Sequence, residues 1–194
     1  ALNCDNTRIR QLNQMPDLFM LTCSDTLISR LPVLPSIQHL DIDMPCEYGI
    51  IRECISFINS LQTLRICNQT IRHNSIISHR FLELRILILY QCDIIYESSI
   101  SEFPKLEEIR LTSCKINDTL EGVQKKLRVL RLVDTPISTI HYIAQYASEI
   151  YIEGNRTILS GQHIRRIYKP YILTKLTMKK TSLQKNNGAI DQYK

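Results

Sequence analysis

The chain has 194 residues, 44% of them hydrophobic, and its 24 basic and 19 acidic residues give a formal net charge of +5. This composition agrees with a folded chain that buries a long continuous core. It excludes a helical membrane span, because no apolar run approaches the roughly 18–20 residues that such a helix requires.

A spaced pattern of apolar residues recurs along the whole chain. Counting the opening residue of each copy as position 0, the pattern also occupies positions 3, 5, 8 and 10. The first copy covers residues 2–9 and lacks its opening residue, so we expect a piece of a longer protein; the alternative is that residues 1–17 act as a cap. Successive copies begin 19 to 26 residues apart. The others span 18–28, 37–45, 61–71, 84–94, 106–116, 127–137, 147–157 and 173–183.

The spacing within each copy predicts a short β-strand followed by an inward turn. Positions 3 and 5 place two apolar side chains on one face of a strand, because side chains alternate along it. Position 8 turns inward and holds a small polar or sulfur side chain that can bond neighbouring turns. Pro45 and Gln69 depart from this rule, so we expect an irregular turn between the third and fourth copies. The position 8 series is Thr7, Thr26, Pro45, Gln69, Cys92, Cys114, Thr135, Asn155 and Thr181.

The segments between the strands differ along the chain. Residues 31–35 contain two prolines and are predicted to be extended. Residues 50–58, 137–147 and 162–169 have apolar spacings compatible with short helices. No single copy can bury its own apolar face, so stability must come from stacking neighbours.

On these residues the chain resembles the leucine-rich repeat family over its full length. Cys92 and Cys114 are similar to the cysteine-containing subclass found in F-box substrate receptors, whereas residues 2–7 and 31–35 resemble the short repeats of bacterial effectors and giant viruses. The resemblance implies a single α/β solenoid domain over residues 1–194, with about nine repeats. It implies a horseshoe with a parallel sheet on its concave face and short helices, 3-10 turns or extended segments on its convex face. It also implies recognition of another macromolecule, commonly a protein, through the concave sheet.

Positions 4 and 6 point away from the core, onto the sheet face that the resemblance assigns to binding. Acidic residues gather at the N-terminal end of these two rows, and arginines with two tyrosines occupy the centre. Glu108 and Asp134 are the nearest acids to the arginines, which leaves guanidinium donors for an acidic partner. The alternative is a solvated sheet face. The predicted partner-binding residues are Arg65, Tyr90, Arg110, Arg131 and Tyr151.

A basic stretch follows at the C-terminal end of the chain. No acidic residue lies between Glu153 and Asp191. Such a patch can meet nucleic acid phosphate or an acidic partner, and the alternative is a solvated end face. The residues that would make this contact are Arg165, Arg166, Lys179 and Lys180.

Cysteines and histidines carry no sign of a catalytic or metal site. The seven cysteines and five histidines share no zinc-ligand spacing, and no catalytic motif is present. We therefore expect no enzyme activity, no cofactor and no metal. Four cysteines, Cys4, Cys23, Cys92 and Cys114, fall on inward positions and are predicted to be buried free thiols. Cys67 instead falls on the outer face of its strand.

The odd number of cysteines favours an intracellular protein. Three glycosylation patterns, at Asn68, Asn117 and Asn155, leave secretion open. Two main classes of function stand at this point. One is a protein-recognition module, such as the substrate-receptor part of a ligase or an effector, and the other is a structural subunit of a larger complex or particle. An extracellular immune-type receptor fragment is a third.

Overall fold

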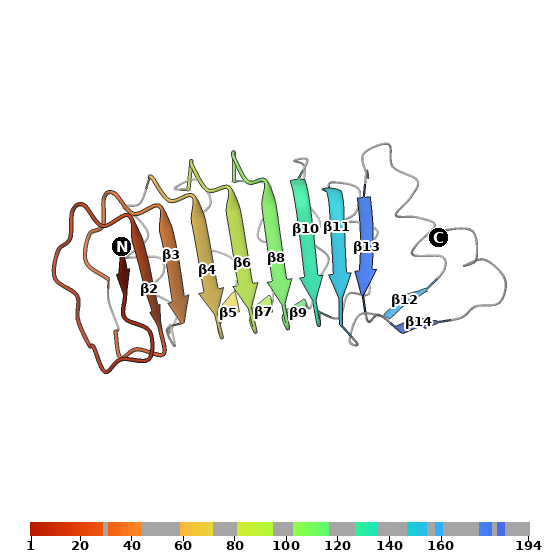
Figure 1. The fold of residues 1–194 in the computed structure, drawn as a ribbon, viewed down its shortest axis with the longest axis horizontal. Helices are drawn as coiled ribbons and strands as arrows, with labels where there is room; N and C mark the ends of the chain where they lie inside the picture. Colours follow the sequence, from red (N-terminus) through yellow and green to blue (C-terminus); the bar gives the residue numbers. More distant parts are fainter. Residues whose placement is uncertain are drawn as a thin grey trace.

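The apolar pattern forms one parallel β-sheet of nine strands, in the order β1-β2-β3-β4-β6-β8-β10-β11-β13. The computed structural model describes residues 1–28, 31–43, 59–71, 81–94, 103–116, 127–135, 147–154, 158–160, 175–179 and 182–184. Figure 1 shows the strands side by side, in chain order, all pointing the same way. The fold is therefore a parallel β-solenoid. Its main strands are β1 (Leu2–Asn3), β2 (Met20–Ser24), β3 (His39–Asp43), β4 (Thr63–Cys67), β6 (Ile86–Tyr90), β8 (Glu108–Thr112), β10 (Leu127–Val133), β11 (Ala147–Glu153) and β13 (Lys175–Lys179).

The strand register confirms the predicted alignment of the copies. Position 3 residues lie opposite one another in every neighbouring pair, from Leu2 with Leu21 at one end to Ile150 with Leu176 at the other. Position 5 residues are aligned in the same way from Cys23 with Ile42 onward. The side chains at these two positions are almost fully buried from Leu21 to Ile152. The core is thus a stack of equivalent apolar layers, one per turn.

A second apolar column, which the pattern did not include, lies three residues before the opening residue in four described turns. Met15, Leu34, Phe81 and Phe103 pack there, and the rings of Phe81 and Phe103 lie 6.0 Å apart. In each of these turns the carbonyl of the column residue accepts a hydrogen bond from the opening residue of the strand, at 3.1–3.3 Å. Proline follows the column residue in three of the four turns, where its fixed φ suits the first corner of a β-turn.

Where position 7 is described, the strand ends there in a left-handed turn. Seven described residues there have positive φ, from 46° to 56° in the six non-glycine residues and 105° in Gly154. In five of the six non-glycine residues, the backbone N–H donates a hydrogen bond to the carbonyl of the position 6 residue in the next turn, at 2.8–2.9 Å. Asparagine, aspartate and glycine tolerate this conformation best, and they fill five of the seven positions. The residues are Asn6, Asp25, Asn68, Gln91, Ser113, Asp134 and Gly154.

Position 8 forms a buried polar column beside the turns. The Thr135 hydroxyl donates to carbonyls of Leu111 and Val133, and the Cys114 thiol to that of Leu89 at 3.3 Å. The Cys92 thiol donates to the carbonyl of Tyr90 at 3.4 Å, and its contact with Cys114 and its burial raise its pKa. The prediction that Cys92 and Cys114 are buried free thiols is confirmed.

Short strands continue the chain beyond this column. Strands β5 (Thr70–Ile71), β7 (Asp93–Ile94) and β9 (Lys115–Ile116) pair in parallel, so position 10 is aligned as predicted in these three turns. Toward the C-terminus the alignment shifts: in strands β12 (Ile158–Ser160) and β14 (Ser182–Gln184), Leu159 lies opposite Leu183. The prediction that Thr157 occupies position 10 is therefore wrong by two residues. Ile9 also departs, because it is 36% exposed.

The predicted helices are not seen in the described ranges, which contain strands, turns and irregular segments. Residues 50–58 and 162–169 lie outside those ranges. So does the segment 137–147 apart from Ala147, which begins β11 rather than ending a helix. Residues 31–35 are described and lack regular structure, as their prolines predict. Nothing in the described part of the chain forms a helix with the length and apolar character needed to cross a bilayer.

Candidate functional site

The candidate site is the face of the nine-stranded sheet opposite the core, which we call the open face. From β1 to β11 it carries the side chains at positions 2, 4 and 6, because these alternate with the buried positions 3 and 5. Strand pairing aligns the position 4 row from Asn3 to Thr177 without a break. All five residues predicted to bind a partner lie on this face. Tyr90 is in the position 6 row, and the position 4 row reads Asn3, Thr22, Asp41, Arg65, Ile88, Arg110, Arg131, Tyr151 and Thr177.

The centre of the open face is apolar along strand β6. Ile86, Ile88 and Tyr90 are all half-buried there, and we call them the β6 strip. Val133 adds half-buried apolar surface on β10, two strands away, whereas Val129 on the same strand is only 7% exposed. The prediction missed Ile86 and Val129, because it assigned only positions 4 and 6 to the binding face and left out position 2, the residue just before the first core residue of each strand.

Arg65 is held by two neighbours on the open face. Its Nη1 lies 2.6 Å from Asp41 Oδ2 on β3, and its guanidinium carbon lies 5.8 Å from the centre of the Tyr90 ring on β6. Burial raises the pKa of Asp41, and the hydrogen bond and charge of Arg65 oppose that rise. Asp41, which the prediction did not count among the acids near the arginines, therefore takes one of the five N–H donors of Arg65.

Cys67 lies on the open face, as its position predicts, but it is only 3% exposed. Its short side chain stands beside the larger Tyr90 on the next strand. Burial raises the pKa of Cys67 to about 11, which keeps the thiol protonated at neutral pH. The positive charge of Arg65, which reaches toward Tyr90, favours the thiolate form of Cys67 and so opposes this rise in the pKa of the thiol.

Arg110 is committed to a buried carboxylate. Its Nε lies 2.7 Å from Glu108 Oε1 on the same strand, and the Glu108 side chain is 9% exposed. Arg128 approaches the other oxygen of Glu108, with its Nη2 at 3.7 Å. Glu108 was one of the two acids expected near the arginines, and it takes the Nε donor of Arg110 and offsets its charge.

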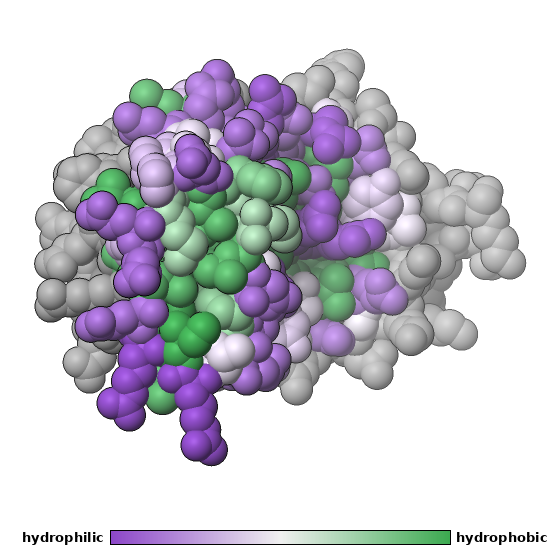
Figure 2. Space-filling model, turned by 60° about the vertical axis from the view of Figure 1, so that its left-hand side comes forward, coloured by the Kyte–Doolittle hydropathy of each residue, from purple (hydrophilic) through white to green (hydrophobic). Residues whose placement is uncertain are grey.

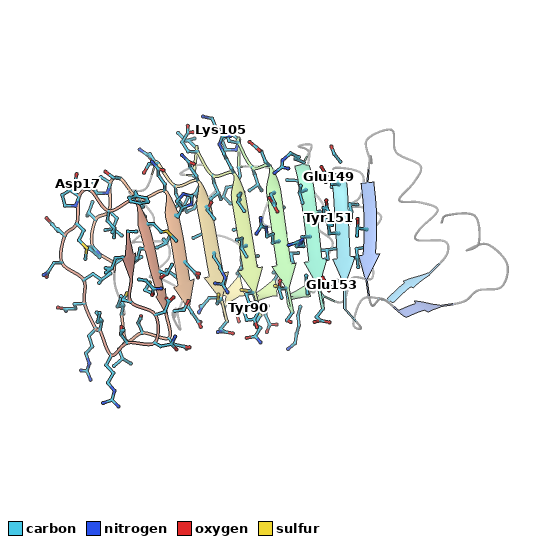
Figure 3. All side chains as sticks on the ribbon, in the orientation of Figure 1. Asp17, Tyr90, Lys105, Glu149, Tyr151 and Glu153 are labelled. Atoms are coloured by element: carbon cyan, nitrogen blue, oxygen red, sulfur yellow. The ribbon has the colours of Figure 1, made fainter. Side chains whose placement is uncertain are left out.

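Arg131 differs from the other two arginines. It is exposed, and its guanidinium carbon lies 5.5 Å from the centre of the Tyr151 ring on β11. The Tyr151 hydroxyl donates to Glu149 Oε2 at 2.8 Å, which holds the ring in place; Figure 3 shows Tyr151 between Glu149 and Glu153 on this strand. Among the described residues, no carboxylate lies within ion-pair distance of Arg131.

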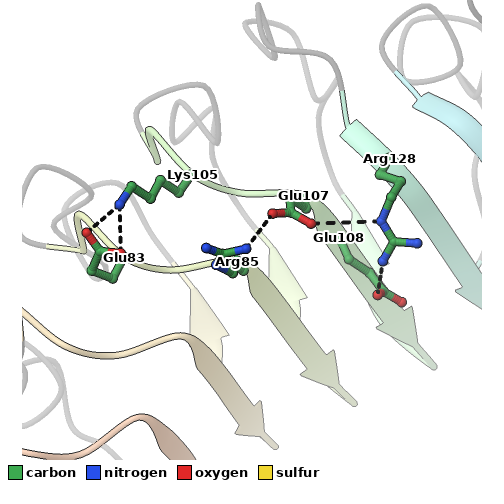
Figure 4. Close-up of polar contacts among 6 residues, drawn as sticks. All are labelled: Glu83, Arg85, Lys105, Glu107, Glu108 and Arg128. Carbon is green, nitrogen blue, oxygen red and sulfur yellow. Dashed lines mark hydrogen bonds and ion pairs between the residues drawn. The ribbon is translucent and has the colours of Figure 1, made fainter.

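A ladder of charges lines the edge where the chain enters the central strands (Figure 4). Lys105 lies 2.6 Å from Glu83 on the preceding turn, and Glu107 lies between Arg85 at 3.1 Å and Arg128 at 3.8 Å. These side chains are 41–58% exposed, so each pair adds little to stability. Because every pair joins neighbouring turns with opposite charges, the ladder favours the observed order of turns.

The N-terminal end of the solenoid exposes apolar side chains. Leu27 is 53% exposed and Val33 is 51% exposed. Figure 2 shows apolar surface at this end, bordered by hydrophilic side chains. Arg8 and Arg10 are exposed there too.

Several predicted positions fall outside the part of the chain that the structure describes. Arg165, Arg166 and Lys180 do, together with Asn117 and Asn155; Lys179 ends β13, and only its backbone is described. Asn68 is described and exposed, and its Nδ2 donates to both Asp43 carboxylate oxygens at 2.8 Å. No group of three or more potential metal ligands is found in the described ranges.

No protein-family profile matches this chain, and no curated protein or solved structure gives a significant match. The function of the open face must therefore be argued from its own chemistry.

Proposed function

We propose that this chain is a leucine-rich-repeat solenoid that binds another protein through its open face and performs no catalysis. The repeat spacing and the parallel register of nine strands support the repeat class. In this proposal the open face is the concave side of a horseshoe, and the segments between strands form its convex side. We also propose an intracellular location, which the five free cysteines of the described ranges support.

The observation that carries the proposal is the β6 strip with arginines on both sides. Specific interfaces have an apolar centre enriched in aromatic residues and arginine, and a polar rim. Here Ile86, Ile88 and Tyr90 provide the apolar centre, with Arg65 on one neighbouring strand and Arg110 on the other. From β4 to β11 the face crosses four strand spacings, or about 19 Å, which is the scale of a standard interface.

The test compares the same substitution at two apolar residues, one on the open face and one away from it. Once a partner is recovered by pull-down on the immobilised chain, Ile88→Asp should weaken its binding at least tenfold, because it puts a charge in the centre of the interface. The control is Leu82→Asp, since Leu82 is 50% exposed in the turn before β6 and lies off the open face. Circular dichroism and thermal melting check that both variants fold. If the two substitutions weaken binding equally, or neither does, the open face is not the site.

The exposed apolar end favours a second candidate, a structural subunit that packs end-on against a neighbour. A neighbour that covers Leu27 and Val33 would bury two side chains that are each about half exposed. Sedimentation velocity of the chain over a range of concentrations tests this candidate. Association that Leu27→Lys with Val33→Lys abolishes, while Ile88→Asp leaves it intact, would favour assembly through the end over recognition through the open face.

A further inference from the structure

We infer that the open face recognises an extended, acidic peptide segment. One carboxylate of the segment binds Arg131, and an apolar side chain three residues away packs on the β6 strip. This inference rests on the proposed function and names the partner chemistry for it.

The first step is the state of Arg131. Of the three arginines in the position 4 row, Arg65 and Arg110 are each paired with a carboxylate at 2.6–2.7 Å, which offsets their charge. Arg131 lies over the Tyr151 ring and, within the described ranges, has no carboxylate at ion-pair distance. A guanidinium that lies over an aromatic ring and has no carboxylate partner keeps N–H donors free to bind a carboxylate in a bidentate way.

The second step is what surrounds Arg131. Val133, which is half-buried, lies beside it on β10, and the β6 strip lies two strands away. Apolar neighbours exclude water from a bound ion pair and so strengthen it. A partner that offers only charge would leave this apolar surface uncovered, whereas a segment with both an acidic and an apolar side chain covers it.

The third step is distance. Arg131, Arg110 and Ile88 are aligned on consecutive strands, so Arg131 and Ile88 are separated by two strand spacings, or about 9.6 Å. A peptide in the polyproline II conformation has three residues per turn and rises about 3.1 Å per residue. Side chains three residues apart therefore lie on the same side at about 9.3 Å. Such a segment, lying across the strands, reaches both sites with the pattern apolar-x-x-acidic in either direction.

The charge pattern favours a peptide over a nucleic acid. The open face carries Glu108, Glu149 and Glu153 around Arg131, as well as Asp41 and Asp43 toward the N-terminus. A phosphate backbone that tracks across the strands would meet these carboxylates and be repelled. A single carboxylate placed on Arg131 brings one negative charge to its partner and none to the rest of the strands, so it meets far less repulsion.

The experiment begins with an unbiased choice of ligand. A displayed library of random eight-residue peptides is selected on the immobilised chain. We expect enriched sequences to share Asp or Glu three residues from Leu, Ile or Phe. The best peptide is then labelled, and its affinity is measured by fluorescence anisotropy, alongside a version with its acidic residue changed to the amide.

Arg131→Gln should weaken the acidic peptide at least tenfold and remove its advantage over the amide version. Arg8→Gln is the matched control, because Arg8 is also exposed but lies at the N-terminal end; it should change the affinity less than twofold. If no peptide is enriched, or if Arg131→Gln leaves the acidic preference intact, the inference is overturned.

The outcomes also separate this inference from the proposed function. Peptides that lose binding with Ile88→Asp but show no dependence on Arg131 would overturn the acidic motif and leave the open face as the binding surface. Peptides that bind equally well to both variants would overturn both. If a single-stranded oligonucleotide displaces the peptide, with the same dependence on Arg131, the inference of a carboxylate ligand is overturned and Arg131 binds a phosphate instead.

Discussion

Removing Arg110 should destabilise the fold, whereas removing Arg131 should not, although both are arginines of the same row. Arg110→Ala leaves the buried Glu108 carboxylate without the donor that lies 2.7 Å away. Arg131→Ala removes an exposed side chain whose contact is the Tyr151 ring. The two substitutions delete the same number of atoms and the same charge. The difference between their costs in free energy of unfolding therefore measures how much Arg110 stabilises the buried Glu108 carboxylate.

The expected free-energy costs of the two substitutions follow from how deeply each arginine and its partner are buried. Breaking a fully buried ion pair costs about 3–5 kcal/mol. Here Arg110 is 38% exposed, and Arg128 Nη2 remains 3.7 Å from the second Glu108 oxygen, so part of that cost is screened. We therefore expect Arg110→Ala to cost about 1–3 kcal/mol, the range for leaving a buried polar group unpaired. Arg131→Ala should cost less than about 1 kcal/mol, since an exposed cation–π contact is worth about 0.5–1 kcal/mol.

Urea unfolding of the single variants measures these free energies, provided the slope of the transition is unchanged. The double variant Glu108→Gln with Arg110→Ala tests the cause, because neutralising the carboxylate should bring the further cost of Arg110→Ala below about 1 kcal/mol. Equal costs for Arg110→Ala and Arg131→Ala would refute the reasoning, and so would a cost of Arg110→Ala that Glu108→Gln does not change.

Three further predictions concern the core, a turn and a thiol. Leu87→Ala should cost about 2–5 kcal/mol in urea unfolding, because the side chain is 2% exposed, whereas Leu82→Ala, at a 50% exposed position, should stay within about 0.5 kcal/mol; equal effects would contradict the strand register. Gly154→Ala should lower stability by about 1–3 kcal/mol, because φ is +105° and the added carbon would clash with the Asp134 side chain; an unchanged thermal midpoint would count against this turn geometry. Burial raises the pKa of Cys67 to about 11, so labelling of this thiol in the native state should stay slow at pH 8 and accelerate as the pH approaches 11. Mass spectrometry after timed alkylation, with the urea-unfolded chain as control, checks this; equally fast labelling of both states at pH 8 would show that the thiol is not buried.

The spacing of apolar residues was sufficient to predict the strands, their register and most of the core. This is because each repeat is a local unit whose neighbours repeat its geometry, so one alignment of the sequence places Leu21, Leu87 and Leu130 in equivalent layers. The left-handed turn could also have been predicted, since Asn6, Asp25 and other residues that tolerate positive φ recur at position 7. The second column was visible as well, in the prolines that follow Met15, Leu34 and Phe103.

The pairing of the charges was decided by the tertiary structure. The sequence by itself determined that Arg65, Arg110 and Arg131 share a row, because side chains alternate along a strand and the copies align. It did not determine that Asp41 pairs with the first, Glu108 with the second and a tyrosine ring with the third. Those partners depend on rotamers and on which side chains lie beside each arginine, on its own strand or on a neighbouring one about 20 residues away in the sequence. The burial of Cys67 has the same origin: its position on the sheet is local, but its neighbours come from other strands.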